Sequence, residues 1–161
     1  MNVKELFLTQ KQTEHQGTMA VYGKIPPDRL AWRPAEGVLT LGQMARHVWL
    51  SEQGFVRTAI EGDWGYSERR IPQGLLAVLG EVTRLEDELN QLQRVHEETM
   101  RAAEAFPLEL WNEIRENPKF NLRWPAGVIL FRIIEHQVHH RAQVGTYLRL
   151  LSGVRASPYP L

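Results

Sequence analysis

The sequence contains no cysteine among its 161 residues. A disulfide framework and a thiolate zinc site are therefore excluded, and any thiol chemistry needs a thiol from outside the chain. An excess of one charge is also missing, because 19 basic residues balance 19 acidic ones. The basic residues are scattered, which argues against nucleic acid as a partner, since phosphates reward a basic patch.

Long hydrophobic runs and flexible linkers are absent as well. The longest apolar runs, such as Val128 to Phe131, are far too short to cross a bilayer. The stretch from Met1 to Gln16 is polar and lacks the apolar core of a signal peptide. We therefore expect a cytoplasmic protein without a membrane partner, folded as a single domain over residues 1–161.

What the sequence does contain is helical periodicity, with proline, glycine or asparagine in the gaps. The predicted helices cover about Val3 to Tyr22, Leu41 to Ile60, Leu75 to Ala105 and Pro125 to Leu151. Residues 62–73 are predicted to form a polar loop, and residues 106–124 a second loop with one short helix around 108–114. No segment alternates like a strand, so the predicted fold class is all-α, a four-helix bundle.

Two of these helices have clear start signals. Thr40 followed three residues later by Gln43 is a capping box, which opens the second helix. Pro125 opens the fourth, because proline suits the first turn of a helix.

Two histidines share the inner face of the fourth predicted helix. At about 100° per residue, His136 and His140 fall in the same stripe as Ile133 and Val144, whereas His139 points elsewhere. Residues four apart stand about 5 to 6 Å apart at Cβ, a spacing at which two imidazoles can share a metal ion. Taken alone, the pair fits equally well with two core histidines that are each hydrogen-bonded to a neighbour.

His47 on the second predicted helix favours the metal. It lies at the edge of that helix's apolar stripe, where a neighbouring helix would pack. Three buried imidazoles would each need a partner, at about 1 to 3 kcal/mol for each unsatisfied group, and one metal ion satisfies all three. Three histidines with an open fourth position are typical of a catalytic zinc site. We predict that His47, His136 and His140 bind one metal ion; a metal-free bundle in which they only pack is the alternative.

Other metal-site patterns fit less well. His96 on the third predicted helix is a candidate further ligand, but a lone core histidine is more often hydrogen-bonded. A di-iron bundle needs Glu-x-x-His and a metalloprotease helix needs His-Glu-x-x-His, and the sequence has neither motif.

Three polar residues are candidates for the pocket around this site. Glu52 lies inside the apolar stripe of its helix, and a buried carboxylate needs a partner. It is a candidate acceptor behind a ligand ring or a general base, with a structural bond to a tryptophan or arginine as the alternative. Gln143 and Tyr147 share the face of the histidine pair, and core packing or a helix-face hydrogen bond would also explain them.

The fourth predicted helix has a second apolar face, made of Phe131, Ile134, Val138, Ala142 and Gly145. A helix that is apolar on two sides is either central in its bundle or buries one side against another subunit. We expect a homodimer through this face.

Two runs carry a resemblance to a known family. Thr40-Leu41-Gly42-Gln43-Met44-Ala45-Arg46-His47, followed by Ser51-Glu52, and His136-Gln137-Val138-His139-His140-Arg141-Ala142-Gln143 together resemble the DinB/YfiT superfamily of metal-dependent proteins. Leu30-Ala31-Trp32-Arg33-Pro34 resembles that family's entry into helix two, and Ala142 stands where some relatives have glycine.

This resemblance implies a down-up-up-down bundle, often dimeric, that holds zinc or nickel with three ligands. By motif position the ligands fall on His47, His136 and His140. The resemblance also implies a reaction similar to those of characterised relatives. These include thiol transferases that use bacillithiol, mycothiol or glutathione, and a mycothiol-dependent maleylpyruvate isomerase.

We therefore expect a divalent-metal-dependent enzyme that activates a low-molecular-weight thiol for transfer to a small electrophilic substrate. The lack of cysteine fits this function, because the chain cannot supply the sulfur itself. A metal-dependent hydrolase would use the same site with water as nucleophile. A non-catalytic, metal-stabilised bundle that binds a ligand or acts in a stress response is the alternative from another class.

Overall fold

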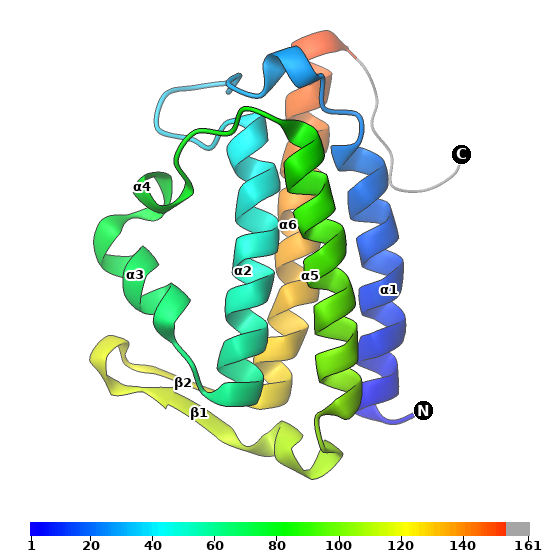
Figure 1. Ribbon diagram of the computed structural model, residues 1–161, viewed down its shortest axis with the longest axis vertical. Helices are drawn as coiled ribbons and strands as arrows, with labels where there is room; N and C mark the ends of the chain where they lie inside the picture. The colour runs from blue at the N-terminus through cyan, green and yellow to red at the C-terminus, as the bar shows by residue number, and fades with distance from the viewer. Residues whose placement is uncertain (154–161) are drawn as a thin grey trace.

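Four long helices form the body of the molecule in the computed structural model, which describes residues 1–153 (Figure 1). They are α1 (Val3–Tyr22), α2 (Leu41–Glu61), α5 (Leu85–Ala105) and α6 (Ala126–Ser152). Helices α1 and α6 run in one direction and α2 and α5 in the other, so α2 and α5 are parallel neighbours. This arrangement is a down-up-up-down bundle, and it confirms the predicted fold class.

Helix α2 begins and ends at local signals in the sequence. Gln43 N donates to Thr40 Oγ1 and Thr40 N donates to Gln43 Oε1, both over 3.1 Å, as the predicted capping box requires. Gly62 ends the helix in the left-handed region at φ 73°, where residues other than glycine are strained. The position of His47 along this helix therefore follows from local rules.

Residues 62–73, predicted to be a loop, instead contain helix α3 (Gly65–Gln73), so this prediction was wrong. None of its residues is buried, and a helix without a buried face gives little apolar periodicity to find. Helix α3 lies close to α2 because Gly54 has no side chain. A Cβ at Gly54 would lie 2.7 Å from the ring of Tyr66.

The predicted helix from 75 to 105 is also wrong, because it is broken into α4 (Leu75–Leu79) and α5. Gly80 takes φ 61° at the break, a conformation that no helix contains. The guanidinium of Arg46 on α2 donates to the carbonyl oxygens of Leu79 and Glu81 over 2.9 and 2.8 Å. A long-range contact thus satisfies backbone groups that a continuous helix would have paired internally.

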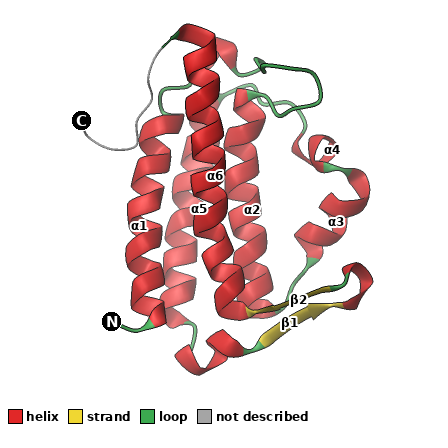
Figure 2. Cartoon of the chain, turned by 180° about the vertical axis from the view of Figure 1, so that it is seen from behind, coloured by secondary structure: helices red, strands yellow, loops and turns green. Residues whose placement is uncertain are grey.

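The connection between α5 and α6 holds a small antiparallel hairpin at the base of the bundle (Figure 2). Its strands are β1 (Ile114–Asn117) and β2 (Leu122–Pro125), with 3-10 turns at Pro118–Phe120 and, before the hairpin, Leu108–Asn112; another lies at Pro27–Arg29. The short helix expected near 108–114 is therefore a 3-10 turn, and the expectation of no strand was wrong. Strands of four residues are too short to show a clear alternation.

The core consists of two apolar clusters with polar side chains buried between them. One cluster centres on Tyr22, Leu41, Val48, Leu92 and Leu148, and the other on Phe7, Phe106, Trp111, Leu130 and Ile133. Between the clusters, four buried polar side chains contact one another in a row, one from each long helix. In order they are His96, Lys11, Glu52 and Gln137. Within the described residues, no helix is long and apolar enough to cross a membrane.

Candidate metal centre

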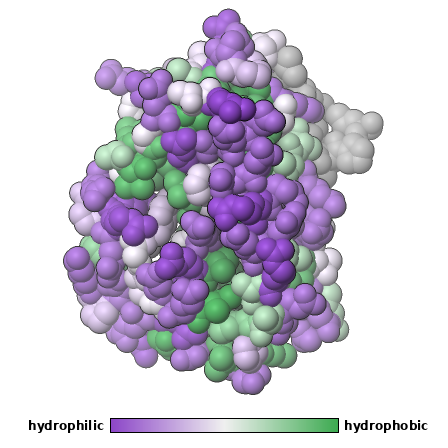
Figure 3. All heavy atoms as spheres, viewed as in Figure 1, coloured by the Kyte–Doolittle hydropathy of each residue, from purple (hydrophilic) through white to green (hydrophobic). Residues whose placement is uncertain are grey.

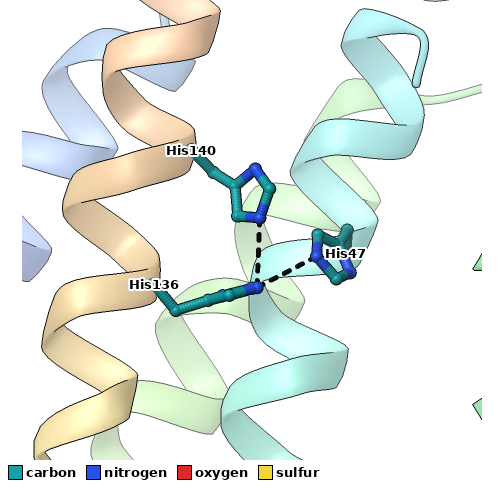
Figure 4. A group of neighbouring side chains, drawn as sticks. All are labelled: His47, His136 and His140. Carbon is teal, nitrogen blue, oxygen red and sulfur yellow. Dashed lines mark hydrogen bonds between the residues drawn. The ribbon is translucent and has the colours of Figure 1, made fainter. Parts of the chain in front are cut away.

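Three ring nitrogens from α2 and α6 meet between these two helices (Figure 4). His136 Nε2 lies 3.0 Å from His47 Nε2 and 3.1 Å from His140 Nε2. The ligand atoms of all three histidines lie within 4.8 Å of one another, and this group could hold a metal ion. The i, i+4 spacing on α6 sets the two rings of His136 and His140 one turn apart, and the packing of α2 against α6 adds His47.

The donor set fits a divalent metal better than it fits mutual hydrogen bonding. Two nitrogens bound to tetrahedral zinc, each about 2.0 to 2.1 Å from it, lie about 3.3 Å apart, close to the spacing seen here. Each neutral imidazole nitrogen offers either one hydrogen or one lone pair, so His136 Nε2 cannot bond well to both neighbours. One shared cation would satisfy all three nitrogens at once.

Hydrogen bonds at the Nδ1 atoms of His140 and His47 orient these rings so that their Nε2 atoms face the centre of the group. His140 Nδ1 donates to Gln143 Oε1 over 2.7 Å, which leaves Nε2 as the lone-pair nitrogen. His47 Nδ1 lies 3.2 Å from Ser51 Oγ, and Ser51 Oγ lies 3.2 Å from the hydroxyl of Tyr66 on α3. The candidate pocket residue Gln143 is thus bonded to a candidate ligand ring.

Burial keeps the three rings neutral. Loss of hydration, together with the charge that His140 would carry, lowers the pKa of His47 to about 3. The same causes, in the same order, lower the pKa of His136 to about 2. Burial also lowers the pKa of His140 to about 4, against the opposing effect of its bond to Gln143. Neutral imidazole is the form that binds metals at pH 7.

Glu52 lies in the polar chain that crosses the bundle. Its Oε1 is 3.0 Å from Lys11 Nζ, and its Oε2 accepts from Gln137 Nε2 over 2.7 Å. Both side chains of the Lys11–Glu52 pair are fully buried. The partner is neither the tryptophan nor the arginine that the sequence suggested, but a lysine from α1. Glu52 is thus linked to Gln137, the residue that follows His136 on α6.

The remaining candidates lie in different places. Tyr147 borders a cavity beside His140 and packs edge-on against Trp32, with ring centroids 5.8 Å apart. His139 is exposed on α6, as its helical position predicted. His96 bonds to Lys11 Nζ over 2.8 Å through Nδ1, in a separate group of residues.

Ser51 and Tyr66 are the residues that the sequence did not single out for this role. Ser51 stands four residues after His47, so helical spacing could have paired them. No local signal pointed to Tyr66, because it reaches the site only through the packing of α3 on Gly54.

Two cavities border the histidine group. One, of about 550 Å³, reaches His140 and lies between α6, residues 37–39 and residues 73–77. The other, of about 370 Å³, reaches His136 and is lined by Phe55, Arg132, Glu135 and His139 as well. A metal bound at the centre would be reachable from both sides.

The fold and the histidine group together define a four-helix bundle with a candidate three-histidine metal centre. The sequence matches the DinB superfamily over residues 12–144, and the chain belongs to this superfamily. Its structure is similar to that of a DinB-like protein, YjoA, from Bacillus subtilis, with a TM-score of 0.74 and 18% sequence identity over 96% of each chain. This likeness shows the shared fold. No curated protein matches the sequence.

Proposed function

We propose that this protein is a metal-dependent enzyme that activates a low-molecular-weight thiol and transfers it to a small electrophile. The observation that carries this proposal is the convergence of three neutral imidazole nitrogens, on the buried His47 and His140 and the half-buried His136, beside two cavities. Zinc and nickel are the proposed metals, since both accept imidazole ligands, and three histidines leave a coordination position open for the thiol. The absence of cysteine means that the sulfur comes from the cosubstrate.

Each residue of the centre has a proposed part in this chemistry. A bound divalent metal supplies a Lewis acid that favours the thiolate form of the cosubstrate. His47, His136 and His140 would hold it, and the bonds to Ser51 and Gln143 keep the rings of His47 and His140 in the ligating orientation. Tyr147 is the proposed pocket residue that orients the substrate, because it borders the cavity beside His140.

Metal content and turnover together test the proposal. We expect about one equivalent of zinc or nickel in purified protein, and little in a His136→Ala variant. The matched control is His139→Ala, which removes an exposed ring from the same helix turn and should keep the metal. Wild-type protein without stoichiometric metal would defeat the proposal.

The reaction is tested with bacillithiol, mycothiol and glutathione, each paired with 1-chloro-2,4-dinitrobenzene. Transfer forms a sulfur–carbon bond and releases chloride, so absorbance of the thioether reports turnover. A metal-loaded protein that hydrolyses esters and transfers no thiol would point to the hydrolase alternative. Metal without turnover of any kind would point to a binding protein.

We also propose a homodimer through α6, although part of its second apolar face packs within the chain. Phe131 meets Phe7 edge-on at 5.6 Å, whereas Val138 stays 39% exposed. We expect light scattering at micromolar concentration to give twice the chain mass. Val138→Glu should yield monomers, and Val128→Glu, exposed on another side of the same helix, should not. A monomeric wild-type mass would refute the dimer.

A further inference from the structure

We propose that the substrate held beside His140 has an uncharged, apolar body, which lies in the cavity under α4 while its reacting group faces the metal centre. This inference rests on the proposed function and specifies its substrate. It concerns the 550 Å³ cavity, whose size falls within the range of about 300 to 1,000 Å³ that is usual for small-molecule sites.

The side chains that line this cavity are of two kinds. The polar ones are His140, Gln143 and Tyr147 on α6 and Gln73 at the end of α3. The apolar ones come from three separate segments, namely Val38, Leu39, Met44, Leu75, Leu76 and Ala77. A ligand that fills it therefore needs a polar or reactive head and an apolar body.

Charge separates this cavity from the one beside His136. Among the described residues that line the larger cavity, none carries a carboxylate, ammonium or guanidinium group. The smaller cavity is lined by Arg132 and Glu135, which also form an ion pair with each other. A charged body in the larger cavity would lose hydration without gaining a partner, which costs several kcal/mol. The larger cavity therefore selects against ionised ligands.

The outer wall of the cavity is formed by α4 and can cover an apolar body. Helix α4 is only five residues long and is flanked by Gly74 and Gly80 at φ 79° and 61°. Leu76 on this helix is 40% exposed, and hydrophobic side chains gather over α4 on the surface (Figure 3). A seated apolar ligand would remove part of this surface from water. The wall formed by α4 thus provides apolar contact area for such a ligand.

Hydroxamic acids with alkyl tails of increasing length test the inference by calorimetry on zinc-loaded protein. The hydroxamate head binds metal, so acetohydroxamate measures the centre alone. Each added methylene should strengthen binding about threefold to fourfold until the tail fills the cavity. A tail of equal length that ends in a carboxylate should lose this gain.

Two variants locate the tail. Leu76→Asp places a charge on the wall at a position exposed enough to tolerate it, and should reduce the affinity ratio of octanohydroxamate to acetohydroxamate at least tenfold. Glu135→Gln, in the smaller cavity, is the matched control and should leave the ratio unchanged. Because the ratio is compared, a change in metal loading alone cannot imitate the result.

The outcomes separate the two proposals. Equal affinity for short and long tails, with metal bound, would overturn the apolar substrate and leave the metal-centred function standing. A length dependence that Glu135→Gln abolishes and Leu76→Asp spares would place the ligand in the other cavity and also overturn it. Acetohydroxamate that fails to bind zinc-loaded protein would defeat the open coordination position, and with it both proposals.

Discussion

The bundle contains two groups of inward-facing histidines, and they are built differently. Between α2 and α6, the Nε2 atoms of His47, His136 and His140 converge to 3.0 and 3.1 Å. Between α1 and α5, the rings of His15 and His96 lie parallel, 3.7 Å apart at their centroids and inclined by 2°. Four of these five histidines are buried and His136 is half-buried, so burial alone does not distinguish the two groups.

The stacked pair has hydrogen-bond partners from the opposite helix. His15 Nε2 donates to Gln93 Oε1 over 2.8 Å, and His96 Nε2 donates to Gln12 Oε1 over 3.1 Å. His96 Nδ1 accepts from Lys11 Nζ. Two glutamine side chains thus accept both Nε2 hydrogens. The parallel rings do not point two lone pairs at a common position where a metal ion could bind.

The pKa values of the histidines do not distinguish the stacked pair from the triad either. Burial lowers the pKa of His96 to about 3 and also lowers that of His15, as it does in the triad. The direction of the ring nitrogens is what separates a packed pair from a candidate ligand set. A perturbed pKa therefore needs geometry beside it before it indicates a site.

The largest expected effect is loss of metal from the triad alone. His136→Ala should remove essentially all bound metal, because it deletes the nitrogen that lies between the other two. His15→Gln, at the stacked pair, should keep full occupancy. Elemental analysis of both variants checks this, and a reversed result would mean that the wrong group has been taken for the centre.

The next effect concerns Lys11, which joins His96 of the stacked pair to Glu52. Lys11→Met leaves Glu52 buried without its cation, and should cost about 3 to 5 kcal/mol of unfolding free energy. Lys11→Met combined with Glu52→Leu should recover part of this loss, because both charges are then removed. Urea unfolding of the metal-free proteins measures it, and equal stabilities of wild type and Lys11→Met would contradict a buried ion pair.

A smaller effect is expected from Gln143, which accepts the hydrogen bond from His140 Nδ1. Gln143→Ala removes the acceptor for Nδ1, and should weaken metal binding about 10-fold to 100-fold without unfolding the protein. Gln93→Ala does the same to His15 in the stacked pair and should leave metal affinity unchanged. Competition with a chelator gives both affinities, and equal losses in the two variants would refute the distinction.

Acid should destabilise the metal-free protein through both groups. The four buried histidines and the half-buried His136 have lowered pKa values when folded, so below pH 6.5 the unfolded chain binds protons that the folded chain does not. Stability is therefore fully present above about pH 6.5 and lost as the pH falls toward the folded values. Each histidine contributes up to about 1.4 kcal/mol per pH unit.

Urea unfolding at pH 7 and pH 5 measures this loss. Equal unfolding free energies at the two values would show that the histidines titrate alike in the folded and unfolded states. A His15→Gln variant should show a shallower loss than wild type, as should His136→Phe, if the stacked pair and the triad both contribute.

The sequence by itself determined α1, α2 and α6, the end but not the start of α5, and two of the three positions in the triad. Capping boxes, glycine stops and the i, i+4 spacing act within one or two turns, so they can be found without knowing the fold. The same local spacing placed His139 outside and His136 and His140 inside. The edge position of His47 suggested a third ligand but could not show that α2 packs against this part of α6.

Only the tertiary structure decided what surrounds these residues. Lys11 pairs with Glu52, Arg46 satisfies the break before α5, and Tyr66 reaches Ser51 because Gly54 leaves room. The sequences of helix α3 and the hairpin show only weak hydrophobic periodicity. Contacts with the bundle therefore define the positions of these elements. Local rules bring side chains to one face of a helix, but only packing brings two faces together, and the candidate metal centre lies where the faces of α2 and α6 meet.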